Sequence, residues 1–253
     1  MIRATLALWH REIVRFLRDR SRLTGSLLQP VIFWVLFSGA LHGSFKPAGV
    51  DYGQYFFVGT LAMITLFTAI FSTITVIEDR KEGFLQGVLV SPVPRAAIAL
   101  GKILGGATLG LGLAIVFLLL GPLAGVSFGW STLPAVLGVL ALLAVAVTGM
   151  GFTLAWLLDS TAGYHGIMMV LFMPMLLLSG AFFPMDQAHP ALSWIRFVNP
   201  MTYGVGALRN VMQGEVPGVP SLGVCLLGTA LFAFATFALG TFVATRRSVR
   251  NAT

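Results

Sequence analysis

Residues 103–158 read ILGGATLGLGLAIVFLLLGPLAGVSFGWSTLPAVLGVLALLAVAVTGMGFTLAWLL and contain no Asp, Glu, Lys or Arg. A helix that crosses a membrane needs about 20 apolar residues, because the hydrocarbon core is about 30 Å thick. The run is long enough for two crossings, and Gly121, Pro122 and Pro134 mark the turn between them. Its side chains are continuously apolar rather than alternating, which favours helices over the strands of a barrel.

Four further charge-free tracts lie on either side of this run, at residues 23–45, 52–77, 160–185 and 216–245. The chain of 253 residues is 57% hydrophobic and 10% charged, whereas soluble domains carry about 25% charged residues. This composition excludes a soluble globular protein. We predict a single all-helical membrane domain over residues 1–253 with six spans, at residues 23–45, 52–77, 103–122, 134–158, 164–183 and 220–245.

The distribution of Lys and Arg predicts the orientation. Cytoplasmic loops carry an excess of these residues, and with the N-terminus inside, only Lys46, Arg196 and Arg209 of the 16 basic residues lie outside. We therefore predict that both termini are cytoplasmic. The basicity gives no indication of nucleic-acid binding, because basic and aromatic residues do not interleave on a compact soluble module.

Residues 1–22 precede the first span and are predicted to form an interfacial helix. At 100° per residue, apolar side chains such as Trp9 and Phe16 gather on one face and arginines on the other. We expect the apolar face to lie at the lipid headgroups and the arginines to face anionic lipid or a cytosolic partner. A simple anchor without a partner is the alternative. The arginines are Arg11, Arg15, Arg18 and Arg22.

Residues 78–102 are predicted to form a cytosolic elbow between the second and third spans. A charge cluster comes first, apolar residues then recur at helical spacing, and Ser91 with Pro92 ends the short helix because proline disfavours helical geometry at the residue before it. Pro94 can then open the next helix. Spans hold this element at both ends, so a push on it must move them; an ordinary surface helix is the alternative. The candidate coupling residues are Glu78, Asp79, Arg80, Glu82, Gly83, Phe84, Leu85, Val88, Leu89 and Pro92.

Residues 184–218 form the last outer segment, which is rich in proline and aromatic residues and poor in charge. We predict broken, half-buried helices that lie at or dip into the outer leaflet. The segment would act either as a substrate gate or as a lid that only seals the outer mouth. The candidate gate residues are Pro184, Asn199, Pro200, Tyr203 and Arg209.

The sequence lacks the motifs that several kinds of site require. The one Gly-Lys pair, Gly101 and Lys102, lacks the rest of a phosphate-binding loop, and the four histidines and Cys225 show no metal-ligand spacing. No enzymatic, cofactor or metal site is therefore predicted. An ion-coupled carrier normally needs an ionisable group near the membrane midplane, and the five charge-free tracts contain none. Uphill transport would then need energy from another chain; a secondary carrier or a non-transporting membrane scaffold are the alternatives.

Two motifs resemble a known family. Residues 77–95, IEDRKEGFLQGVLVSPVPR, followed by Gly101 and Lys102, are similar to the intracellular elbow of permeases of type 2 ATP-binding-cassette (ABC) exporters. Residues 178–184, LSGAFFP, and then residues 199–203, NPMTY, with Leu208 and Arg209, resemble that family's outer signature. The likeness covers essentially the whole chain and is strongest to the daunorubicin-resistance and nodulation lipo-oligosaccharide types.

The resemblance implies a half-transporter in the bacterial cytoplasmic membrane. A second permease copy, expected to give a homodimer, and two cytosolic ABC ATPase subunits would complete it, with ATP and Mg held by the ATPase. Glu82 and Gly83 with residues 84–90 would form the coupling helix, and Arg11 to Arg22 would lie near the ATPase. The expected passenger is amphipathic, drug-like or lipid-linked.

Overall fold

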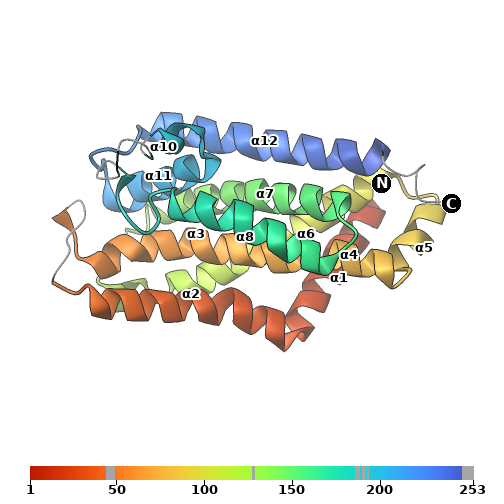
Figure 1. The fold of residues 1–253 in the computed structure, drawn as a ribbon, viewed down its shortest axis with the longest axis horizontal. Helices are drawn as coiled ribbons and strands as arrows, with labels where there is room; N and C mark the ends of the chain where they lie inside the picture. The colour runs from red at the N-terminus through yellow and green to blue at the C-terminus, as the bar shows by residue number, and fades with distance from the viewer. Residues whose placement is uncertain (44–48, 127–128, 186–188, 190–191, 193, 247–253) are drawn as a thin grey trace.

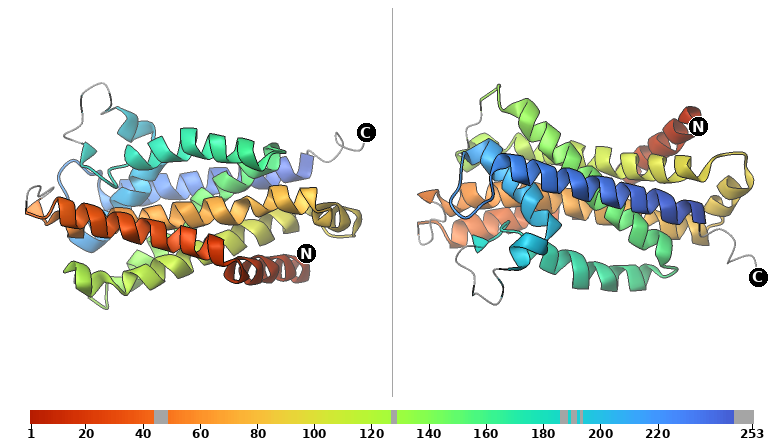
Figure 2. Two further views of the ribbon diagram at one scale, coloured as in Figure 1. Left: turned by 60° about the horizontal axis from the view of Figure 1, so that its bottom comes forward. Right: turned by 90° about the horizontal axis from the view of Figure 1, so that it is seen from above.

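The computed structural model describes residues 1–43, 49–126, 129–185, 189, 192 and 194–246, and every regular element in these residues is a helix. The long helices run side by side in one elongated bundle (Figure 1). α1, α5 and the last turn of α12 lie at one end, and α10 and α11 lie at the other (Figures 1 and 2). The elements are α1 (Ile2–Arg18), α2 (Arg20–Ala40), α3 (Tyr52–Thr73), α4 (Thr75–Lys81), α5 (Phe84–Val90), α6 (Arg95–Leu118), η2 (Gly121–Ala124), α7 (Leu133–Leu157), α8 (Thr161–Leu177), α10 (Ile195–Val198), α11 (Pro200–Gln213) and α12 (Leu222–Arg246).

Five helical stretches of the described chain are long and apolar enough to cross a membrane: α2, the combined α3 and α4 (Tyr52–Lys81), α6, α7 and α12. They correspond to five of the six predicted spans, so the predicted all-helical membrane fold is confirmed. The boundaries shift where charged residues join a helix. The predicted span over residues 23–45 begins at Arg20, and the one over residues 103–122 begins at Arg95.

The sixth predicted span, residues 164–183, is a shorter helix. α8 has 17 residues, or about 25 Å at 1.5 Å per residue, and its predicted end at residue 183 is wrong. Beyond it the chain turns at Gly180, whose φ is 84°, and residues 178–183 fold back onto α3. A Cβ atom at Gly59 would lie 2.1 Å from the carbonyl oxygen of Ala181, so this loop rests directly on the helix backbone.

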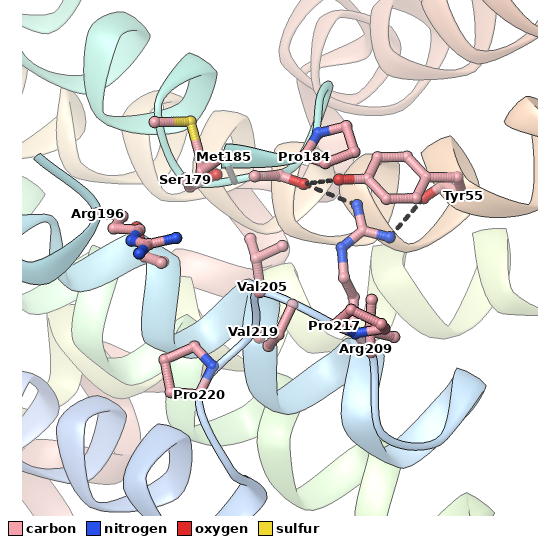
Figure 3. Close-up of a pocket in the computed structure, with 15 residues that line it drawn as sticks. Tyr55, Ser179, Pro184, Met185, Arg196, Val205, Arg209, Pro217, Val219 and Pro220 are labelled. Carbon is pink, nitrogen blue, oxygen red and sulfur yellow. Dashed lines mark hydrogen bonds between the residues drawn. The ribbon is translucent and has the colours of Figure 1, made fainter. Parts of the chain in front are cut away.

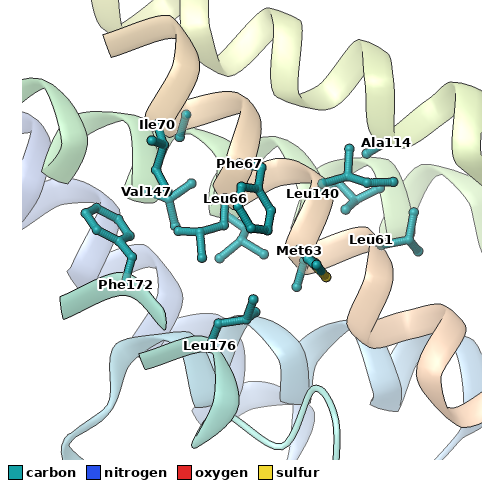
Figure 4. Close-up of a cluster of buried hydrophobic side chains, with 14 of the residues drawn as sticks. Leu61, Met63, Leu66, Phe67, Ile70, Ala114, Leu140, Val147, Phe172 and Leu176 are labelled. Carbon is teal, nitrogen blue, oxygen red and sulfur yellow. The ribbon is translucent and has the colours of Figure 1, made fainter. Parts of the chain in front are cut away.

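α3 is the centre of the bundle. Of its most apolar stretch, 94% is buried inside the molecule, against 11% for α2 and 22% for α12. Figure 4 shows side chains of α3, among them Met63 and Phe67, packed with Leu140 of α7 and Phe172 of α8. α2 and α12 therefore present their apolar faces outward, as helices that face lipid do.

The predicted interfacial helix over residues 1–22 is two helices. α1 ends at Arg18, and Asp19 takes an extended conformation and caps α2, with its side chain accepting a hydrogen bond of 3.2 Å from the backbone N–H of Arg22. A carboxylate at this position satisfies a free N–H of a new helix. The placement of Arg22 on the interfacial helix is therefore wrong, because Arg22 lies in the first turn of α2.

α1 packs closely against the beginning of α6. A Cβ atom at Gly101 would lie 2.6 Å from the Cβ of Leu8, and one at Gly105 would lie 2.8 Å from the Cβ of Glu12. The two glycines therefore let the helices touch along their backbones. The buried stripe of α1 consists of Leu8, Glu12 and Phe16. The predicted apolar face is therefore divided, because Phe16 is 1% exposed whereas Ile2 is 77% exposed.

The predicted elbow, residues 78–102, spans parts of three helices. Its charge cluster lies in α4, its apolar helix is α5 as predicted, and the chain from Arg95 to Lys102 already belongs to α6. The predicted stop at Ser91 is confirmed, since Ser91 is extended with ψ of 157°. The elbow is thus a tight α4–α5–α6 corner.

Candidate coupling site

α5 has one face toward the protein and one toward solvent. Gly83 precedes it with φ of 79°, a left-handed conformation that favours glycine. Leu85 is 3% exposed, whereas Val90 is 86% exposed. The residues of α5 and of the turn after it therefore divide into two sets. The inner set is Phe84, Leu85, Val88 and Leu89, all of them candidate coupling residues, and the outer edge is Gln86, Gly87, Val90 and the candidate Pro92.

Asp79 is the centre of a buried ionic cluster at this end of the bundle. The side chain is fully buried, and Arg11 donates to both carboxylate oxygens, at 2.8 Å from Nη2 and 3.1 Å from Nη1. Arg15 Nη1 donates at 2.5 Å, and Lys102 Nζ forms a further ion pair with Oδ2. Helices α1, α4 and α6 are therefore held together through this one carboxylate.

Glu12 closes the same cluster from α1. Its side chain is 3% exposed and pairs with Lys102 Nζ at 2.7 Å. The hydroxyl of Thr75 donates to Glu12 at 2.9 Å. Lys102, only 2% exposed, thus bridges the carboxylates of Glu12 and Asp79. Buried charges persist in proteins when they are paired and hydrogen-bonded in this way.

Glu78 and Arg80, the neighbours of Asp79, point to other partners. Glu78 pairs with Arg22 of α2 at 2.7 Å and with Arg15 at 3.0 Å. Arg80 pairs with Asp159 at 2.5 Å and donates to the carbonyl oxygens of Trp156 and Leu158, at 2.9 and 3.1 Å. Three consecutive residues of α4 thereby contact α1, α2, α6 and the turn between α7 and α8.

α5 is joined to this cluster through Phe84. The guanidinium of Arg11 lies 3.6 Å from the centre of the Phe84 ring, a cation–π contact. Glu82, 60% exposed, reaches Arg15 at 3.5 Å. A displacement of α5 is therefore felt directly by α1 as well as by α4 and α6.

The arginines of the N-terminal segment differ from the prediction. Arg11, Arg15 and Arg22 turn inward to carboxylates of α4, because α1 packs against α6 and α2 against α3, both next to α4, so the expectation that they face lipid or a partner is wrong. Arg18 is exposed. The sequence analysis missed Glu12 and Lys102 as members of the site. Lys102 directly precedes the charge-free tract at residues 103–158, which was the available signal, whereas Glu12 lies far from any such tract.

The candidate gate residues at the α11 end do not form one cluster. Asn199 caps α11, with Oδ1 accepting from Met201 N–H at 3.0 Å, and Pro200 occupies the first turn. Tyr203 donates to the carbonyl oxygen of Phe197 at 2.8 Å. These residues hold the corner between α10 and α11.

Pro184 and Arg209 instead line a cavity near the N-terminal end of α3 (Figure 3). Arg209 is 1% exposed and donates to the carbonyl oxygens of Gly180 and Tyr55, at 2.8 and 3.1 Å. Burial lowers the pKa of Arg209 to about 10, so its guanidinium stays charged at neutral pH. Within the described residues, no group of three or more His, Cys, Asp or Glu is placed to hold a metal ion.

Residues 3–213 match the ABC-2 type transporter family. The chain belongs to this family. It is 28% identical over 233 residues to Nodulation protein J of Rhizobium leguminosarum bv. viciae, covering 87% of this chain and 85% of the relative. It is 26% identical over 226 residues to the "Probable doxorubicin resistance ABC transporter permease protein DrrC" of Mycobacterium tuberculosis, covering 87% of this chain and 80% of the relative.

Family membership confirms the resemblance carried by the two sequence motifs. The chain is an integral membrane protein and the permease subunit of an ABC exporter. As a member of this family it is a transmembrane subunit, and it associates with an ABC ATPase.

Proposed function

We propose that this permease exports an amphipathic, drug-like or lipid-linked molecule from the cytoplasm, driven by ATP that a separate subunit hydrolyses. The names of the relatives, a nodulation protein and a doxorubicin resistance permease, support this class of passenger. Two copies of the chain would pair as a homodimer in the bacterial cytoplasmic membrane. Two ABC ATPase subunits would dock beneath them, with ATP and Mg bound on the ATPase.

The α5 end would face the cytosol, with both termini on that side. The distribution of basic residues supports this orientation, because Arg11, Arg15, Arg80 and Lys102 all lie at this end and Arg196 and Arg209 lie at the other. The exposed edge of α5 would then meet the ATPase.

One observation carries the coupling role: α5 joins an exposed apolar edge to an inner face tied to the bundle. Val90 is 86% exposed, while Phe84 stacks on Arg11, which itself pairs with the fully buried Asp79. A partner that pushes on Val90 therefore moves α1, α4 and α6 together, because buried ion pairs are costly to separate. In this proposal α5 is the element that the partner displaces, and the candidate residues around it either belong to it or attach it to the bundle. These residues are Glu78, Asp79, Arg80, Glu82, Gly83 and Leu85.

The test places a charge on the exposed edge of α5. Val90→Asp should leave the purified chain folded and should abolish ATP-driven transport in vesicles that also contain the ATPase subunit. Leu123→Asp is the matched control, because Leu123 is 81% exposed on η2, outside the α5 corner. If Val90→Asp retains full transport, or if Leu123→Asp loses it equally, α5 is not the docking element.

A further inference from the structure

A cavity of about 140 Å³ at the α11 end has an apolar wall and polar side chains with atoms that lack a hydrogen-bond partner. It lies between the first turn of α3, residues 179–185, α11 and residues 216–220 (Figure 3). Val205 and Val219 form part of the apolar wall. The polar side of the cavity is formed by Arg196, Thr202 and Arg209.

The two arginines bring positive charge that the described chain does not neutralise with a carboxylate. Arg209 is held by carbonyl oxygens and by the face of the Tyr55 ring, 3.5 Å from its guanidinium carbon. Arg196 reaches toward the cavity from α10 and rests on Phe197, at 4.7 Å. Neither forms an ion pair with any of the described residues. A buried cation of this kind attracts an anion more strongly than one in water.

Two polar atoms at the cavity have no hydrogen-bond partner. They are Arg196 Nε and the hydroxyl oxygen of Thr202, a residue that is 7% exposed. Buried polar atoms are nearly always hydrogen-bonded in folded proteins. The guanidinium and the hydroxyl can both donate, so the missing partner is an acceptor, and a negatively charged one suits the local potential.

The position of the cavity indicates where that acceptor comes from. Trp194, on one side of Arg196, is 58% exposed, and Phe197, on the other, is 60% exposed. Exposed aromatic residues of this kind lie at the lipid headgroups of a membrane protein. The apolar wall next to the arginines suits the acyl chains of a lipid, and the planar guanidinium matches the oxygens of a phosphate.

We propose that this cavity binds the phosphate headgroup of an anionic phospholipid from the leaflet at the α11 end. Arg196 and Thr202 donate hydrogen bonds to the phosphate oxygens, and Arg209 contributes its charge from the cavity wall. The bound lipid then fastens α10 and α11 to the loop at residues 179–185.

The test measures retained lipid in the complex of the full chain with its ATPase, purified from membranes that contain both phosphatidylglycerol and phosphatidylcholine. Native mass spectrometry counts the tightly bound phosphatidylglycerol. We expect Arg196→Gln to lower its retention by about tenfold, which corresponds to about 1.4 kcal/mol, near the low end for a hydrogen bond to a charged group. Thr202→Val, which removes only the hydroxyl, should lower retention by a smaller factor without disturbing the fold.

Arg3→Gln is the matched control, since Arg3 is exposed on α1 at the other end and its loss changes the net charge equally. The proposal is overturned if Arg196→Gln retains normal phosphatidylglycerol, or if Arg3→Gln loses as much. It is also overturned if phosphatidylcholine is retained equally in an Arg196-dependent manner. A third arm adds inorganic phosphate alone, and displacement of the lipid by millimolar phosphate would assign the site to a soluble anion and overturn the lipid assignment.

Discussion

Asp79→Asn is the substitution that tests the ionic cluster most directly. The change keeps the shape of the side chain and removes a charge that is fully buried and paired with three cations. Arg11 and Arg15 remain 30% and 23% exposed and keep other acidic partners. Lys102 is 2% exposed and, among the described residues, keeps Glu12 as its one acidic partner. Removing one member of a buried pair costs about 3–5 kcal/mol, because the remaining charge is left poorly compensated.

The matched control is Asp159→Asn. Asp159 also pairs with an arginine of α4, Arg80, at 2.5 Å, but its side chain is 68% exposed. An exposed pair contributes about 0–1 kcal/mol. The two variants thus remove the same charge from ion pairs that each involve one residue of α4, and the two carboxylates differ in burial.

The assay is the free energy of unfolding of the purified chain in detergent, measured by denaturant titration. We expect Asp79→Asn to lose several times more stability than Asp159→Asn. Combining Asp79→Asn with Lys102→Met should cost less than the sum of the two single changes, by about 1–3 kcal/mol, because the residues share one network. Equal losses of unfolding free energy for the two Asn variants, or strict additivity in the double variant, would refute the inference that the cluster holds α1, α4 and α6 together.

Three further outcomes are expected from single substitutions. Gly59→Ala should destabilise the chain by about 1–3 kcal/mol, because the new Cβ would meet the backbone of Ala181. Gly39→Ala, at a position with open space around it, should not destabilise the chain. Thermal unfolding of both variants distinguishes them. Gly83→Ala should strain the start of α5 by about 1–2 kcal/mol, because residue 83 has φ of 79°, and it should lower the amount of substrate transported per ATP hydrolysed. Gly87→Ala, at a helical position with open space, should do neither. Simultaneous measurements of transport and ATP hydrolysis decide this. Glu82→Ala removes an exposed contact with Arg15 and should change stability by less than about 1 kcal/mol. It should nevertheless uncouple transport from ATP hydrolysis. Full coupling in the variant would contradict the coupling role proposed for Glu82.

The spans and the α5 corner follow from the sequence because each depends on local signals. Charge-free tracts mark the helices that lipid can surround, and Ser91 with Pro92 ends α5 whatever lies around it. The break at Asp19 is less visible, because an acidic residue between arginines suits a continuous helix as well as a cap.

The ionic cluster could not be predicted from the sequence in the same way. Glu12 and Lys102 lie on different helices, and hydropathy treats both as ordinary boundary residues. They meet because Gly101 and Gly105 let α1 approach α6 closely enough to bury them. The short α8 was missed for a similar reason, since the turn at Gly180 is stabilised by contacts to the distant Tyr52 and Tyr55.

α3 and α4 connect the two ends of the molecule, and the two ends are fastened with unequal strength. The combined stretch Tyr52–Lys81 has 30 residues, or about 45 Å of helix. At the α5 end it is held by ion pairs of the partly exposed Glu78 and of the fully buried Asp79, and breaking a buried pair costs several kcal/mol. At the α11 end it is held by hydrogen bonds from Tyr52 and Tyr55 to carbonyl oxygens of residues 180–182, each contributing about 0.5–1.5 kcal/mol. Arg209 adds hydrogen bonds to the carbonyl oxygens of Tyr55 and Gly180, each contributing about 1.5–3 kcal/mol. Under the proposed function, a push on α5 therefore moves the charged end as one body, and the contacts that yield are those between α3 and the loop at residues 180–182. Under the proposed function we therefore expect the opening step of export at the α11 end.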